Sequence, residues 1–147
     1  MAFDASALAL PDFEAAIRLD AKNGDARNGR GFARVRLGQD VRGAVGDAEE
    51  AIRLGPETSR TLYNAARTYA QAVGRFDART IPRDLPLATR GRYQDRAVQL
   101  LRQAIVHVPA AQRGLYWKTI EPDAALDPIR RSAGFVQLIV ENAGAAK

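Results

Sequence analysis

Few side chains in this sequence are of the types that carry out chemistry. His107 is the only histidine, and there is no cysteine. A histidine acting as a base or a metal ligand needs an oriented partner, and the residues around His107 suggest none. Ser6, Ser59 and Ser132 lie in no nucleophile motif, and Ser59 is typical of the start of a helix. We therefore expect His107 to have a structural or solvent-exposed role.

The 17 carboxylates of the chain form neither an evident acid–base pair nor an evident metal site. Glu49 and Glu50 are neighbours on an expected helix, so their side chains point apart rather than forming an acid–base pair. Without cysteine the chain has no disulfide, no thiolate nucleophile and no cysteine-ligated metal. No cluster of histidines and carboxylates has metal-ligand spacing. The sequence predicts a protein that is not an enzyme and that has no cofactor and no metal.

The charge of the chain is carried mainly by arginine. The net charge is +5, and the only lysines are Lys22, Lys118 and Lys147. Arginine suits carboxylate and phosphate partners. Hydrophobic residues make up 46% of the chain, which is enough for a packed core. There is no apolar run of membrane-spanning length, and Asp4 stands where a secretory signal would be positive, so we expect a cytoplasmic protein.

The elements that position these side chains follow a repeat. Residues 51–54 read AIRL, as do residues 16–19, and Ile52 follows Ile17 by 52 − 17 = 35 residues. Between them, residues 24–56 have the periodicity of two helices joined by a tight turn at Gly38. Helix-turn-helix units that recur at about 34 residues are typical of one family of helical repeats.

Small residues recur at matched places in two successive helical hairpins. They allow helices to approach closely, and chance would seldom place all of them. The matched positions are Gly31 with Ala66, Ala44 with Ala97, and Ala51 with Ala104.

On these residues the chain resembles the tetratricopeptide repeat (TPR) family. The resemblance implies an all-α fold, a right-handed α-α superhelix of about two and a half hairpins with an irregular helical C-terminal cap. The family usually has apolar residues where Arg27 and Arg34 stand, and we expect their aliphatic stems to cover apolar surface.

A single TPR-like domain is expected over residues 1–147. Residues 1–10 form a frayed lead, 11–20 a half repeat, 24–56 the first repeat, 57–109 the second repeat and 110–147 the cap. Pro82 and Pro86 predict a long loop over 74–91, inserted between the two helices of the second repeat. The incomplete first repeat leaves open whether the chain is a fragment and whether two copies pair.

The C-terminal third also resembles the TPR tails of large bacterial serine/threonine kinases. The resemblance is carried by residues 96–105 and by Asp127-Pro128-Ile129-Arg130 ahead of Phe135. The Asp-Pro that usually precedes that phenylalanine is replaced by Ala133-Gly134. No kinase catalytic motif is present, so a regulatory fragment of a kinase-type protein is an alternative interpretation without kinase activity.

The TPR resemblance implies a concave groove lined by the first helix of each hairpin. The groove residues it implies are Asn28, Phe32, Arg36, Arg60, Tyr63, Asn64, Arg67 and Arg113. Asn64 and Arg113 match the clamp that grips chaperone C-termini in this family, but Asn28, Phe32 and Trp117 replace its other residues. We expect a looser groove for an acidic peptide, with Arg60, Arg67 and Arg113 as its cations. The alternative is that these arginines pair with Asp25, Glu57 and Asp95.

The function predicted is a non-enzymatic scaffold that binds a protein or peptide partner, possibly acidic, in this groove. The alternative is nucleic-acid binding through the arginine-rich loop, which carries Arg75, Arg79, Arg83, Arg90 and Arg92. Because aromatic residues for stacking are few there and acidic residues dilute the charge, nucleic acid is the less favoured partner. Trp117 is expected to close the core at the end of the array. Partner identity and oligomeric state are not determined by the sequence.

Overall fold

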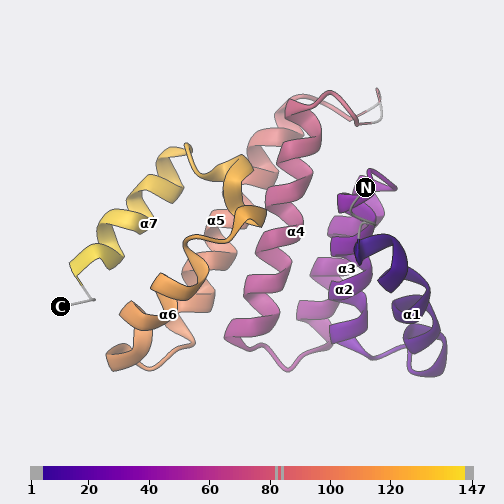
Figure 1. The fold of residues 1–147 in the computed structure, drawn as a ribbon, viewed down its shortest axis with the longest axis horizontal. Helices are drawn as coiled ribbons and strands as arrows, with labels where there is room; N and C mark the ends of the chain where they lie inside the picture. The colour runs from indigo at the N-terminus through magenta and orange to yellow at the C-terminus, as the bar shows by residue number, and fades with distance from the viewer. Residues whose placement is uncertain (1–4, 82, 84, 145–147) are drawn as a thin grey trace.

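The described part of the chain is entirely helical. The computed structural model describes residues 5–81, 83 and 85–144. Figure 1 shows α1 at one end of the molecule and α7 at the other, with α4 and α5 side by side between them. The elements are α1 (Ala5–Leu19), α2 (Gly24–Arg36), α3 (Val41–Leu54), α4 (Ser59–Asp77), α5 (Ala88–Val106), the 3-10 helix η1 (Ala110–Gln112), α6 (Arg113–Ile120), the 3-10 helix η2 (Ala124–Ile129) and α7 (Ala133–Ala143).

Four of the α-helices start at polar side chains that accept a hydrogen bond from a backbone N–H of the first turn. The caps are Asn23 for α2, Asp40 for α3, Thr58 for α4 and Ser132 for α7. Such caps satisfy N–H groups that have no partner within the helix. The cap of α4 is therefore Thr58, and Ser59, which the sequence suggested for this role, is its first helical residue.

Close helix packing occurs where the small residues recur. A Cβ added to Gly31 of α2 would lie 2.6 Å from the carbonyl oxygen of Ala44 in α3, so only glycine fits there. The matched alanines at 44, 51, 66, 97 and 104 are all at most 1% exposed. The matched small residues are thus all at helix contacts or in the core, as the repeat pattern predicts.

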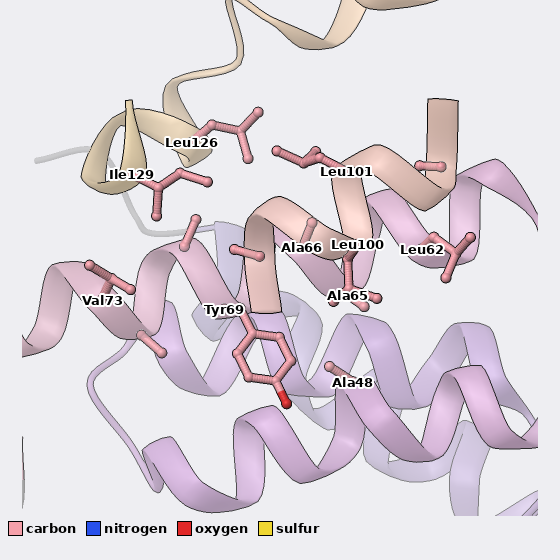
Figure 2. Close-up of a cluster of buried hydrophobic side chains, with 14 of the residues drawn as sticks. Ala48, Leu62, Ala65, Ala66, Tyr69, Val73, Leu100, Leu101, Leu126 and Ile129 are labelled. Carbon is pink, nitrogen blue, oxygen red and sulfur yellow. The ribbon is translucent and has the colours of Figure 1, made fainter. Parts of the chain in front are cut away.

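The hydrophobic core is centred on α4. Figure 2 shows side chains of α4 between those of α3, α5 and η2. From α4 the cluster includes Leu62, Ala65, Ala66, Tyr69 and Val73, from α5 Leu100 and Leu101, and from η2 Leu126 and Ile129. The two η2 residues are fully buried, so the C-terminal segment is an integral part of the core.

Aromatic residues close the C-terminal end of the core. Trp117 of α6 is 5% exposed, and its ring lies 5.8 Å from that of Phe135 in α7, measured between centroids. Phe135 is itself fully buried. This placement of Trp117 agrees with the expectation that it closes the core.

The structure corrects the sequence prediction at two places. Residues 5–10 of the predicted lead and the half repeat form one helix, because α1 begins at Ala5 and contains Pro11 in its interior. Residues 1–4 of the lead lie outside the described residues. The predicted loop over 74–91 is also shorter, because α4 continues to Asp77 and α5 begins at Ala88. Ion pairing between Asp77 and Arg90, at 2.7 Å, ties these added helical turns together.

None of the helices in the described ranges combines the length and the apolar character needed to cross a bilayer.

Candidate functional site

A cavity of about 350 Å³ opens between α1, α2 and α4, and we call it the N-terminal cavity. Its lining residues are Ala5, Ser6, Ala9 and Phe13 from α1, Asp25, Asn28, Gly29 and Phe32 from α2, and Arg60, Asn64 and Arg67 from α4. The α2 and α4 residues recur at helical spacing, so each helix contributes one stripe. The cavity therefore lies where two successive hairpins and the N-terminal helix meet.

The structure brings five of the eight predicted groove residues to this cavity: Asn28, Phe32, Arg60, Asn64 and Arg67. The remaining three, Arg36, Tyr63 and Arg113, do not line it.

Gly29 allows α1 to pack closely against α2. A Cβ at this position would lie 2.3 Å from the ring of Phe13, so the ring occupies the space that any larger residue would fill. Phe13 thereby becomes a wall of the cavity. No side chain of α1 is buried, and Glu14 of α1 is 3.8 Å from Arg34 of α2. Therefore α1 is held by fewer buried contacts than α2 or α4.

Asn28 is the most buried polar residue of the cavity lining, at 2% exposure. Its side-chain Nδ2 donates to the backbone oxygen of Thr61 in α4 at 3.1 Å. Its Oδ1 has no hydrogen-bond donor among the described residues. A buried acceptor without a donor costs about 1–3 kcal/mol. Arg67 Nε is the other buried polar atom of the described lining without a hydrogen bond, but it lies at ion-pair distance from Asp123.

Arg60 is at the rim of the cavity and pairs with Asp25. Their side chains are 3.3 Å apart and are 72% and 64% exposed. An exposed pair of this kind contributes roughly 0–1 kcal/mol. This pair corresponds to the alternative given in the sequence analysis, in which the groove arginines pair with acids of the same chain.

The guanidinium of Arg67 contacts both a carboxylate and an aromatic ring. Its Nε lies 2.8 Å from Asp123 Oδ2. Its guanidinium carbon lies 4.4 Å from the centroid of the Phe32 ring, which is within the range of a cation–π contact. The cation predicted to bind a partner's carboxylate thus already has a carboxylate from the same chain.

Tyr63 faces the C-terminal cap. Its hydroxyl donates a hydrogen bond to Asp123, and burial together with this contact raises the pKa of Tyr63. Burial alone would raise the pKa of Asp123, but the bonds from Tyr63 and the Ala125 amide and the charge of Arg67 bring its pKa below the usual value. Asp123 therefore joins the start of η2 to α4.

Gln71 extends the same attachment along α4. Its side-chain amide donates to the carbonyl of Ala125 at 2.8 Å. The stretch of α4 that was predicted to be open groove is in part covered by the chain's own cap.

Arg36 and Arg113 lie apart from the cavity. Arg36 is exposed, and its carbonyl accepts a hydrogen bond from Arg75. Arg113 donates to the carbonyls of Val108 and Val106, at 2.9 and 3.1 Å, and so satisfies acceptors at the end of α5. Arg113 does not line the N-terminal cavity with Arg60 and Arg67, and η2 rather than α6 packs along α4.

Two arginines of the arginine-rich loop bind acceptors within the same chain. Arg75 donates to the carbonyls of Val35 and Arg36 at the end of α2. Arg90 makes two hydrogen bonds with Asp77, at 2.7 and 3.1 Å. These contacts leave fewer arginine side chains free to bind phosphate groups, which argues against the nucleic-acid alternative.

Three features of the site escaped the sequence reasoning. Those features are the α1 wall, the capture of Arg67 by Asp123, and the unpaired Oδ1 of Asn28. The acid at 123 is followed by a proline-containing apolar stretch, but nothing in that pattern indicates which helix it covers. Only the three-dimensional path of the chain brings Asp123 to Arg67.

His107 pairs with Glu57 at 2.9 Å on the exposed surface. Within residues 5–81, 83 and 85–144, no three histidine or carboxylate side chains come together in an arrangement that would hold a metal ion.

No protein-family model, curated protein or solved structure matches this chain.

Proposed function

We propose that the chain is a non-enzymatic interaction module that binds a segment of a partner protein in the N-terminal cavity. In this proposal α2 with α3 and α4 with α5 are two TPR-type hairpins of a right-handed superhelix. The observation that supports it is the convergence of Asn28 and Phe32 with Arg60, Asn64 and Arg67 on one open cavity. These residues come from the first helices of two hairpins, and the sequence predicts them as groove residues.

The location of the cavity favours a bound segment over a small substrate. It is open to solvent, and its lining combines two aromatic rings, asparagine side chains and the Arg60–Asp25 ion pair. The volume of about 350 Å³ accommodates a few side chains of a peptide rather than a folded domain.

Filling the cavity tests the proposal. Ala9→Trp on α1 places an indole in the cavity, whereas Ala7→Trp places the same residue at an exposed position of the same helix outside it. Peptides selected from a random display library on the wild-type chain are then measured by titration calorimetry. We expect equal binding to wild type and Ala7→Trp, and at least about tenfold weaker binding, a loss of 1.4 kcal/mol, to Ala9→Trp.

Equal affinity for all three proteins would place the peptide site elsewhere and overturn the proposal. Circular dichroism confirms that both variants keep their helicity. Charge reversal at Arg67 is a poorer test, because it would also separate Asp123 from α4 and loosen the cap.

A further inference from the structure

We infer that the N-terminal cavity takes an uncharged segment, whose backbone N–H donates to Asn28 Oδ1 and whose neighbouring apolar side chain lies between Phe13 and Phe32. This inference rests on the proposed function and specifies the chemistry of its ligand. It also replaces the acidic peptide expected from the sequence.

The first step is the orientation of the Asn28 amide. Its nitrogen is fixed by donation to the Thr61 carbonyl, because only the NH₂ side of an amide can bond to that oxygen. The other end must then be the acceptor Oδ1, which lacks a donor among the described residues. A ligand that satisfies Oδ1 has to supply an N–H or O–H group.

The second step is the charge of the lining. Arg60 is paired with Asp25, and Arg67 is paired with Asp123. A carboxylate in the cavity would compete with these acids for the two arginines, and an ammonium would compete with Arg60 for Asp25, the acid of the described lining. A neutral peptide N–H meets the requirement of Oδ1 without either cost.

The third step is the apolar wall. Phe13 and Phe32 both line the cavity, together with Ala5 and Ala9 from α1. Burying an aliphatic side chain against such walls is worth roughly 1.5–3 kcal/mol. One apolar side chain beside a donated N–H matches the extended backbone of a peptide, in which the two groups belong to the same or adjacent residues.

Access to Oδ1 requires a small movement, since Asn28 is 2% exposed. The element that yields most readily is α1, which has no buried side chain. Ligand binding should therefore shift α1 relative to α2, and the resonances of Phe13 and Gly29 should report that shift.

The test uses four blocked pentapeptides titrated into the isotope-labelled full chain and followed by NMR. The reference is acetyl-Ser-Leu-Ser-Leu-Ser-amide. In two counterparts glutamate or lysine replaces every serine, and in the fourth the nitrogens of all five residues are methylated and the C-terminal amide is dimethylated. The reference should move the Asn28 side-chain resonance and the amides of Phe13 and Gly29. The other three should bind at least about threefold more weakly.

The outcomes separate the inference from the proposed function. Binding of the glutamate or lysine peptide at these residues as tightly as the reference overturns the inference and leaves the proposed function standing. Equal binding of the methylated peptide does the same, because it shows that no N–H is donated. If none of the four moves any resonance of the cavity lining, both the inference and the proposed function are overturned. No protein variant is needed, so misfolding cannot obscure the result.

Discussion

At the scale of single residues, Asp47 is a common ionic partner for three arginines whose role the repeat pattern does not predict. Asp47 is 5% exposed in α3 and makes two hydrogen bonds with Arg30, at 2.7 and 2.8 Å. Arg34 lies 3.3 Å and Arg27 4.0 Å from it. A nearly buried carboxylate is stable only when its charge is compensated in this way. Arg27 and Arg34, which depart from the pattern of the family that the sequence resembles, therefore lie beside a buried acid.

Gly31 provides a sharp test of the helix contact at the same scale. Because its added Cβ would lie 2.6 Å from the Ala44 backbone oxygen, Gly31→Ala must push α2 and α3 apart. We expect the free energy of unfolding to fall by about 1–3 kcal/mol, the usual cost of overpacking. Urea denaturation followed by circular dichroism measures it.

The matched control is Gly46→Ala in α3, where nothing lies within 4 Å of the added Cβ. Relief of glycine's entropy cost in a helix should raise the stability of this variant by roughly 0.5–1 kcal/mol. Stability of Gly31→Ala equal to or above that of the wild type would contradict the close contact at Gly31.

At the scale of elements, helix periodicity predicted most of what is observed. The two helices expected in the second repeat, on either side of the loop predicted over 74–91, correspond to α4 and α5, but both helices extend further into the proline-containing region. Pairing of Asp77 with Arg90 stabilises these extra turns, and such pairing across two helices is invisible to a one-dimensional pattern. In the same way, five groove residues were found because they lie on α2 and α4, whereas Arg113 lies outside the cavity, in the irregular cap that follows no period.

Asp123 is the contact that holds this cap, and its removal tests that role. Asp123→Asn removes the charge that faces Arg67 and weakens the bond from Tyr63. Loss of a hydrogen bond to a charged group costs about 1.5–3 kcal/mol. We expect a loss of stability in that range at neutral pH in urea titrations, and no comparable loss for Asp127→Asn, whose side chain is 64% exposed.

The pH dependence of stability gives an independent measure of Asp123. Its pKa in the folded chain is lowered by Tyr63, the Ala125 amide and Arg67, while an unfolded aspartate titrates at about 3.9. The contribution of Asp123 is therefore complete above that pH and is lost as the pH falls through the folded-state value. The stability difference between wild type and Asp123→Asn should shrink between neutral pH and about pH 3. A difference that stays constant over this range would show that the charge of Asp123 does not hold the cap.

At the scale of the whole molecule, the two ends of the chain contribute unequally to the fold. None of the side chains of α1 is buried, so this helix covers one side of α2 without entering the core. In contrast, Leu126, Ile129, Phe135 and Leu138 of the C-terminal cap are at most 1% exposed and belong to the same core as α4 and α5. The unit that must fold together therefore extends from α2 to α7.

Two truncations test whether the C-terminal cap contributes more to the stability of the fold than α1 does. A chain that begins at Asn23 loses α1 and should still unfold cooperatively, with reduced stability because Phe13 no longer covers Gly29. A chain that ends at Glu121 loses four large, fully packed side chains, each worth about 2–5 kcal/mol. That sum, about 8–20 kcal/mol, is as large as the whole stability of about 5–15 kcal/mol that most domains have, so this chain should show no cooperative thermal transition. Circular dichroism melting curves of both chains distinguish the outcomes. Cooperative unfolding of the chain without its cap would mean that the hairpins form a complete core alone, and the cap would then be an addition to the repeat array rather than part of its folding unit.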